Sequence, residues 1–152
     1  MANPITFTAA TPRFDLPNLF PGQAQKEFYV NEALARLDVI AHPAIQTEIS
    51  TPPTSPGEGE CWLIGSSATG SWTGYEGNLA GWQAGAWVFV PPLKGLRIFD
   101  ISTGGMLFFD GVWQRLAAPT APTGGASVDT EARDAIVNLI ETLRVAGILP
   151  AN

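Results

Sequence analysis

The stretch from residue 60 to residue 116 restricts the fold of this chain more than any other. It contains all five tryptophans, and glycines stand at most of the points where a strand would have to turn. Three apolar runs in its second half are separated by turn sequences: 96–101, 106–109 and 112–116. This pattern predicts a three-stranded antiparallel meander. The Asp110-Gly111 dipeptide before the last run favours a two-residue type I′ hairpin, in which both residues have positive φ.

Two further runs, at 61–64 and 86–90, extend the meander to an antiparallel sheet of about five strands, in a small barrel or a sandwich. Residues 87–90 are apolar on both faces, so we expect this strand to be covered on both sides. The segment 65–85 has six glycines and little apolar periodicity. We expect it to form surface loops.

Composition supports one turn-rich β domain with appendages. A chain of 152 residues is long enough for one domain with a substantial core. Only 14% of the residues are charged, and 16 glycines and 13 prolines favour β structure over a helical bundle. The net charge of −6, with eight Lys and Arg in all, argues against nucleic acid as a partner. Cys61, the single cysteine, is interpreted as a small buried hydrophobe.

Residues 1–22 are expected to form an extended arm, because four prolines forbid a continuous helix. The arm also carries large apolar side chains, so we expect it to lie against its own domain or another subunit. These side chains are Phe7, Phe14, Leu16, Leu19 and Phe20. The first residues do not resemble a secretion signal, and no apolar run approaches the roughly 20 residues of a membrane helix. We therefore expect synthesis in a cytoplasm and no membrane insertion.

Residues 23–46 predict an amphipathic helix and a turn, with Pro43 limiting the helix. The apolar stripe consists of Val30, Ala33, Leu34, Leu37, Ile40 and Ala41. Such a stripe favours packing against the core of the same chain over a groove for a partner. Residues 47–60 are rich in Pro, Ser and Gly and mark a loop before the β domain at 60–116.

Residues 117–127 have the composition of a linker, and 128–152 predict a second helix. Asp129 is placed to cap this helix, and Gly147 ends it. Its apolar residues repeat at the spacing of a coiled-coil seam and include Ile136, Leu139, Leu143 and Ala146. Because about two heptads are marginal alone, this helix needs either its own domain or other copies. We expect it to associate with other copies, in a trimer or a dimer, and packing on its own domain is the alternative.

The sequence predicts no catalytic site, no metal site and no cofactor. The single histidine, His42, has no ligand partner at helical or hairpin spacing. Glu76 and Asp100 are the one carboxylate pair of the β region that turns and loops do not explain, and we interpret them as solvated side chains. Aromatic rings among glycines can bind sugar rings, so a carbohydrate or partner site is predicted in the loop region, with core packing of each ring as the alternative. Its candidate residues are Trp72, Tyr75, Glu76, Asn78, Trp82 and Gln83.

Several strings of residues resemble a known family. They are the string 16–27, with Gly-Gln-Ala-Gln-Lys-Glu at its end, Asn31-Glu-Ala-Leu, Ala68-Thr-Gly-Ser-Trp-Thr-Gly, Leu79-Ala-Gly-Trp, Gly85-Ala-Trp-Val-Phe and Asp110-Gly-Val-Trp. Over about residues 10–116 the chain resembles a domain family of unassigned function. Its members occur in tailed bacteriophages, prophages and gene transfer agents of alphaproteobacteria.

The resemblance implies a virion protein without enzymatic activity. We expect an α+β chain: an extended arm and amphipathic helix, a Gly- and Trp-rich antiparallel β domain, and a short coiled-coil-like helix. The expected role is a head-fibre, spike or tail-fibre subunit for host attachment, which docks on other virion proteins through its arm and has host surface polysaccharide as a candidate ligand. A purely structural adaptor for another fibre protein is the main alternative, and a polysaccharide depolymerase is a weaker one.

Overall fold

The computed structural model describes residues 17, 19, 22, 24–125 and 129–151, and it is an α+β fold. In these residues the chain forms two α-helices, eight strands and one 3₁₀ turn. Their bounds are α1 Lys26–Ala41, β1 Ala44–Ile45, β2 Glu48–Ile49, β3 Cys61–Ile64, η1 Gly70–Trp72, β4 Leu79–Gln83, β5 Ala86–Val90, β6 Arg97–Asp100, β7 Gly105–Phe109, β8 Trp113–Arg115 and α2 Thr130–Val145. Neither described helix is long and apolar enough to cross a membrane.

The strands form two mixed four-stranded sheets, in the orders β1-β6-β7-β8 and β2-β3-β4-β5. Each sheet is a three-stranded antiparallel meander with a two-residue parallel strand added at one edge. The sheets do not close into a barrel, and the prediction of one five-stranded antiparallel sheet was wrong. The added strands β1 and β2 follow each other directly in the chain, so the segment 44–49 links the two sheets side by side.

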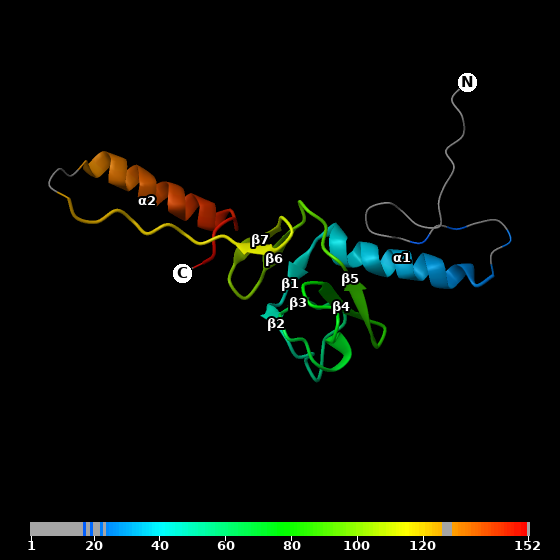
Figure 1. Ribbon diagram of the computed structural model, residues 1–152. Coiled ribbons are helices and arrows are strands. Elements are labelled where there is room, and N and C mark those ends of the chain that lie inside the picture. Colours follow the sequence, from blue (N-terminus) through cyan, green and yellow to red (C-terminus); the bar gives the residue numbers. More distant parts are fainter. Residues whose placement is uncertain (1–16, 18, 20–21, 23, 126–128, 152) are drawn as a thin grey trace, which may run out of the picture.

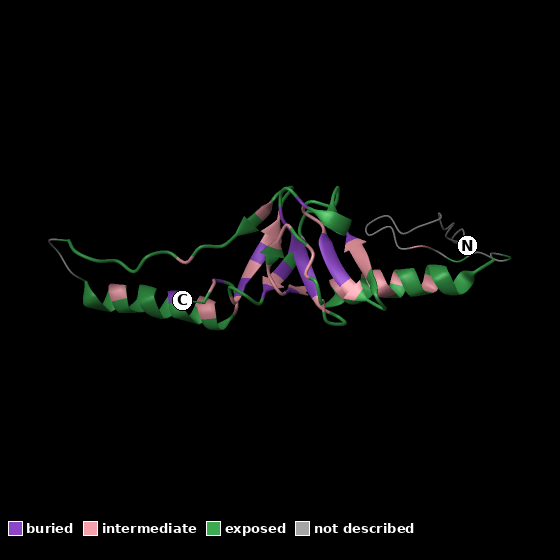
Figure 2. Ribbon diagram, turned by 90° about the horizontal axis from the view of Figure 1, so that it is seen from below, coloured by how far each residue is buried: buried purple, intermediate pink, exposed green. Residues whose placement is uncertain are grey.

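One core lies between the two sheets. It joins Leu63 and Leu79 of one sheet to Ile98 and Leu107 of the other, with Ile45 at their junction, and all five are 1% exposed or less. Because side chains alternate along a strand, the neighbouring positions of β3, β4 and β5 form a second cluster on the opposite face of their sheet. Figure 2 shows the buried residues concentrated in the strands, whereas both helices are largely exposed.

The β4 strand corrects the expectation of surface loops throughout 65–85. Leu79, Ala80 and Gly81 are buried in the sheet. A Cβ atom at Gly81 would lie 2.6 Å from Cγ2 of Val39, so the absence of a side chain allows α1 to approach the strand closely. The glycine that weakened the strand signal is therefore a packing requirement.

The hairpin between β7 and β8 also differs from the prediction. Phe109 pairs with Trp113, so three residues connect the strands, and of these only Gly111 has a positive φ. The type I′ assignment was therefore wrong. The Asp110 carboxylate instead accepts a hydrogen bond from the Val112 amide at 3.3 Å, which stabilises the turn.

The two helices project from the β region in opposite directions (Figure 1). The C-terminal end of α1 packs on β4 and β5 through Val39 and Ile40. Asp129 caps α2 as predicted, accepting a hydrogen bond from the Ala132 amide at 2.9 Å. Beyond α2, Leu149 is buried, and the Ala151 amide donates to the Thr103 carbonyl at 2.8 Å. The last residues therefore anchor the C-terminal end of α2 to the β region.

Candidate interaction surfaces

Trp72, the first candidate of the predicted binding site, lies in the core. It is 0% exposed and stands edge-on to Trp87, with ring centres 5.0 Å apart, and its ring centre is 6.4 Å from that of Trp62. The η1 turn carries Trp72 over the outer face of β3, β4 and β5, so the ring covers a sheet face that would otherwise be exposed to solvent. In this structure Trp72 is not accessible to a partner, and the core alternative holds for this residue.

The other five candidates lie in three different places. Tyr75 is 41% exposed and stacks on Phe89, with ring centres 3.8 Å apart and planes 8° from parallel. Trp82 is half-buried against Trp87 at 4.8 Å, and Gln83 follows it toward α1. The exposed aromatic surface therefore consists of Tyr75 and part of Trp82, each supported by a ring of β5.

Glu76 lines a separate cleft of about 450 Å³, together with Glu48, Ser66, Phe109 and Trp113. Asn78, the remaining candidate, follows Glu76 by two residues and is half-buried. The Trp113 indole donates to the Gly77 carbonyl at 2.8 Å, which fixes the ring at the cleft edge. Phe109 and Trp113 were not among the predicted site residues because they belong to strands, and the aromatic residues on both sides of the Asp110-Gly111 turn were the available signal.

Asp100, the other carboxylate of the pair, belongs to an ion network between the sheets, so its interpretation as a solvated side chain was wrong. Its side chain is fully buried and accepts hydrogen bonds from Arg115 at 2.6 Å and from the Ser102 hydroxyl at 2.6 Å. Arg115 also donates to Glu48 at 2.9 Å, so one guanidinium joins β8, β6 and β2. This geometry gives Asp100 a structural role.

Electrostatics agree with that role. Burial alone would raise the pKa of Asp100, but the hydrogen bonds from Arg115 and Ser102 and the charge of Arg115 outweigh it and hold the pKa below its ordinary value. Burial would lower the pKa of Arg115, and its hydrogen bonds to Asp100 and Glu48 raise it instead. In the described part of the chain, no three His, Cys, Asp or Glu side chains gather closely enough to hold a metal ion.

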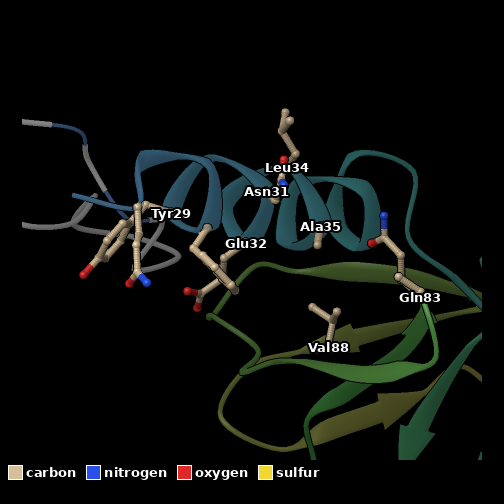
Figure 3. A pocket seen from close by; sticks show the side chains of 10 residues that line it. Tyr29, Asn31, Glu32, Leu34, Ala35, Gln83 and Val88 are labelled. Atoms are coloured by element: carbon tan, nitrogen blue, oxygen red, sulfur yellow. The ribbon is translucent and has the colours of Figure 1, made fainter. Parts of the chain in front are cut away.

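A groove of about 740 Å³ lies between α1 and the β4–β5 hairpin (Figure 3). Phe28, Tyr29 and Ala35 line it from the helix, and Gln83 and Val88 line it from the strands. The groove exists because α1 packs on the sheet only near its C-terminal end. The first two turns of α1 extend beyond the strands.

The apolar stripe of α1 does not face the domain along its length, which corrects the expectation of core packing. Ile40 contacts the core, but Leu34 is 56% exposed and Leu37 is 41% exposed. Figure 3 shows Leu34 pointing away from the strands, while Ala35 faces them. Of the apolar residues of the arm, Leu19 is described and exposed, and Phe7, Phe14, Leu16 and Phe20 lie outside the described residues.

The seam residues of α2 are also largely uncovered. Ile136 is 44% exposed and Leu139 is 59% exposed, Leu143 is half-buried, and Ala146 is exposed. Ile140, beside the seam, is 6% exposed. The helix therefore has one covered side and one open apolar side.

Comparison with known families places the β region. Residues 30–114 match the model of a family described as protein of unknown function, DUF2793. The chain belongs to this family. A search of curated proteins finds no match.

The DUF2793 match runs from the second turn of α1 into β8. It includes both sheets, the aromatic cluster and the strand side of the groove. The linker and α2 follow the matched segment. The seam of α2 is thus a feature of this chain outside its DUF2793 region, and it calls for an explanation of its own.

Proposed function

We propose that this chain is a structural subunit of a phage virion or gene transfer agent particle, in a head fibre, spike or tail fibre that attaches to the host surface. The observation that carries the proposal is that both helices project from the β region with exposed apolar residues, Leu34 and Leu37 on α1 and Ile136 and Leu139 on α2. Apolar side chains that are exposed together on one surface commonly mark a site that another protein surface covers. The virion setting is supported by the sequence resemblance described above.

Deletion of the C-terminal helix tests the structural role. Particles made with a chain lacking residues 128–152 should lack the fibre, because the subunits no longer hold together. Deletion of residues 1–22 should leave an intact fibre protein that no longer docks. Particles that retain a normal fibre with either deletion would contradict the proposal.

Attachment through sugar is the second part of the proposal, and it rests on the exposed Tyr75 and Trp82. Replacing both with Ala should lower adsorption to capsulated cells by about tenfold or more, since each lost aromatic contact removes roughly 1 kcal/mol and a multivalent fibre sums its contacts. Ile101→Ala is the control, because Ile101 is 51% exposed on the loop between β6 and β7. Equal adsorption by all three particles would reject the sugar site.

A structural adaptor for another fibre protein is the second candidate, and the groove beneath α1 favours it. Phe28→Ala and Val88→Ala, on opposite walls, should then release the other fibre protein while the subunit itself stays on the particle. For the depolymerase alternative, purified protein incubated with host polysaccharide should generate new reducing ends. An unchanged number of reducing ends would reject the depolymerase alternative.

A further inference from the structure

The seam of α2 has the layer pattern of a coiled coil. Ile136 and Leu143 occupy a positions, and Ala132, Leu139 and Ala146 occupy d positions. The large residues form the three central layers, and alanines stand at both ends. In the described structure, the seam is the open apolar side of the helix.

The covered side of α2 lies against the linker of the same chain. The Arg133 guanidinium donates to the carbonyl oxygens of Pro122 and Gly124. Further along, Ala118 and Pro119 of the linker lie opposite Ile140, with a groove of about 280 Å³ between the linker and the helix. The linker thus runs back along one flank of the seam, the flank of the e positions, and forms a hairpin with α2.

The other flank of the seam carries small side chains. Its g positions are Ala135 and Thr142, both exposed. The Thr142 hydroxyl donates to the Asn138 carbonyl at 2.8 Å, so its polar group already has a partner within the helix. One flank of the hairpin is therefore raised by the linker, and the other is flat.

We propose that the seam is closed by two further copies of this chain in a parallel trimer, with the linker of each copy lying on the flat flank of the next. In a parallel coiled coil the e flank of one helix meets the g flank of its neighbour. Each raised flank then meets a flat one. In an antiparallel pair two linkers would meet on one side, and two flat flanks would leave the other side open.

Area favours three copies over two. The 16-residue helix is about 24 Å long. With its linker it presents a strip roughly 15 Å wide, so one contact buries about 350 Å² per copy, below the roughly 800 Å² per partner of a stable interface. In a trimer each copy makes two such contacts and approaches that value. Because Leu149 and Ala151 anchor the C-terminal end of each helix, the three β regions come together at one end.

Cysteine cross-linking of the purified full chain tests the orientation. Ala132→Cys should form a disulfide between copies in a parallel assembly, because each d position faces its own equivalent and a disulfide needs Cβ atoms about 4 Å apart. In a mixture of Ala132→Cys and Ala146→Cys chains, a disulfide that joins one kind of chain to the other should form only in an antiparallel assembly. Native Cys61 does not interfere, since burial raises the pKa of its thiol to about 12.

Sedimentation of the same protein tests the seam. The wild type should sediment with three times the mass of one chain, and Leu139→Glu should reduce the mass to that of one chain. Val145→Glu is the matched control, because Val145 is 83% exposed on α2 and stands away from the seam. Helix content measured by circular dichroism shows that each variant still folds.

The proposal that the seam joins three copies would be overturned by a wild type that sediments as one chain. It would also be overturned by a Leu139→Glu variant that keeps the mass of three chains. Cross-linking only in the mixture would overturn the parallel orientation. The inference rests on the proposed assembly role but fails separately from it. A purified trimer that never enters particles would contradict the virion proposal and leave the seam intact.

Discussion

Removal of Arg115 should reveal how far one ion network holds the two sheets together. Arg115→Met keeps most of the aliphatic volume but leaves the fully buried Asp100 carboxylate with Ser102 alone. Breaking a buried pair costs about 3 to 5 kcal/mol. The Arg115 side chain is 42% exposed and water screens its charge, so we expect a loss below that range, about 2 kcal/mol, at pH 7.

The loss should depend on pH in a defined direction. The folded-state pKa of Asp100 lies below its ordinary value, so its contribution is present above the unfolded-state pKa of about 3.9 and disappears as pH falls through the folded-state pKa. Urea unfolding of both proteins should therefore show a difference of about 2 kcal/mol at pH 7 that is smaller at pH 2.

The matched control removes the same charge from β6. In Arg97→Met the lost guanidinium lies 5.9 Å from the Phe108 ring centre, a contact worth about 0.5 to 1 kcal/mol at an exposed site. Its unfolding difference should change little between the two pH values. A loss for Arg115→Met below about 0.5 kcal/mol at pH 7, or one that is equal at both pH values, would refute the role assigned to the buried pair.

Three further outcomes follow from the packing. Trp72→Ala should lower the free energy of unfolding by about 3 to 5 kcal/mol, whereas Tyr75→Ala should cost under about 1, and urea unfolding separates the two. Gly81→Ala should cost about 1 to 3 kcal/mol because its Cβ meets the stiff Val39 side chain, and adding Val39→Ala should recover part of that loss in the same assay. The Cys61 thiol should react with a thiol reagent only as fast as the protein unfolds, and fast labelling of the folded protein would contradict its burial.

Local patterns identified the elements of this fold better than their partners. Strands 61–64 and 86–90 lie where the sequence placed them, and Asp129 caps α2 as predicted. The β1 and β2 strands could not be found, because two residues carry no periodicity and neither strand has an antiparallel hairpin partner. The β1 strand pairs in parallel with β6, far along the chain, and β2 pairs in parallel with β3 across the loop that separates them. The division into two sheets follows from these short strands, so the sequence pattern could not indicate it.

The candidate site was predicted less well, for a related reason. Glycines around Trp72 suggested a loop with exposed rings, yet the loop folds back and inserts that ring into a cluster with Trp62 and Trp87. Whether a tryptophan is exposed depends on what covers it, which composition does not record. Tyr75, three residues after Trp72, remains exposed in the same segment.

Both helices raise the same question about apolar stripes. Periodicity located both helices, but the domain covers neither predicted stripe along its length: Leu34 points away from the strands, and Leu139 lies open beside a linker that covers Ile140 instead. An apolar stripe that its own chain leaves exposed has a reason to exist only if another surface covers it. For α2 the heptad spacing and the unequal flanks favour copies of the same helix as the covering surface. The stripe of α1 does not follow a heptad repeat, and it adjoins a groove whose lining includes amide and aromatic side chains. We therefore propose different tasks for the two ends of the molecule, self-association at α2 and the binding of a different partner at α1.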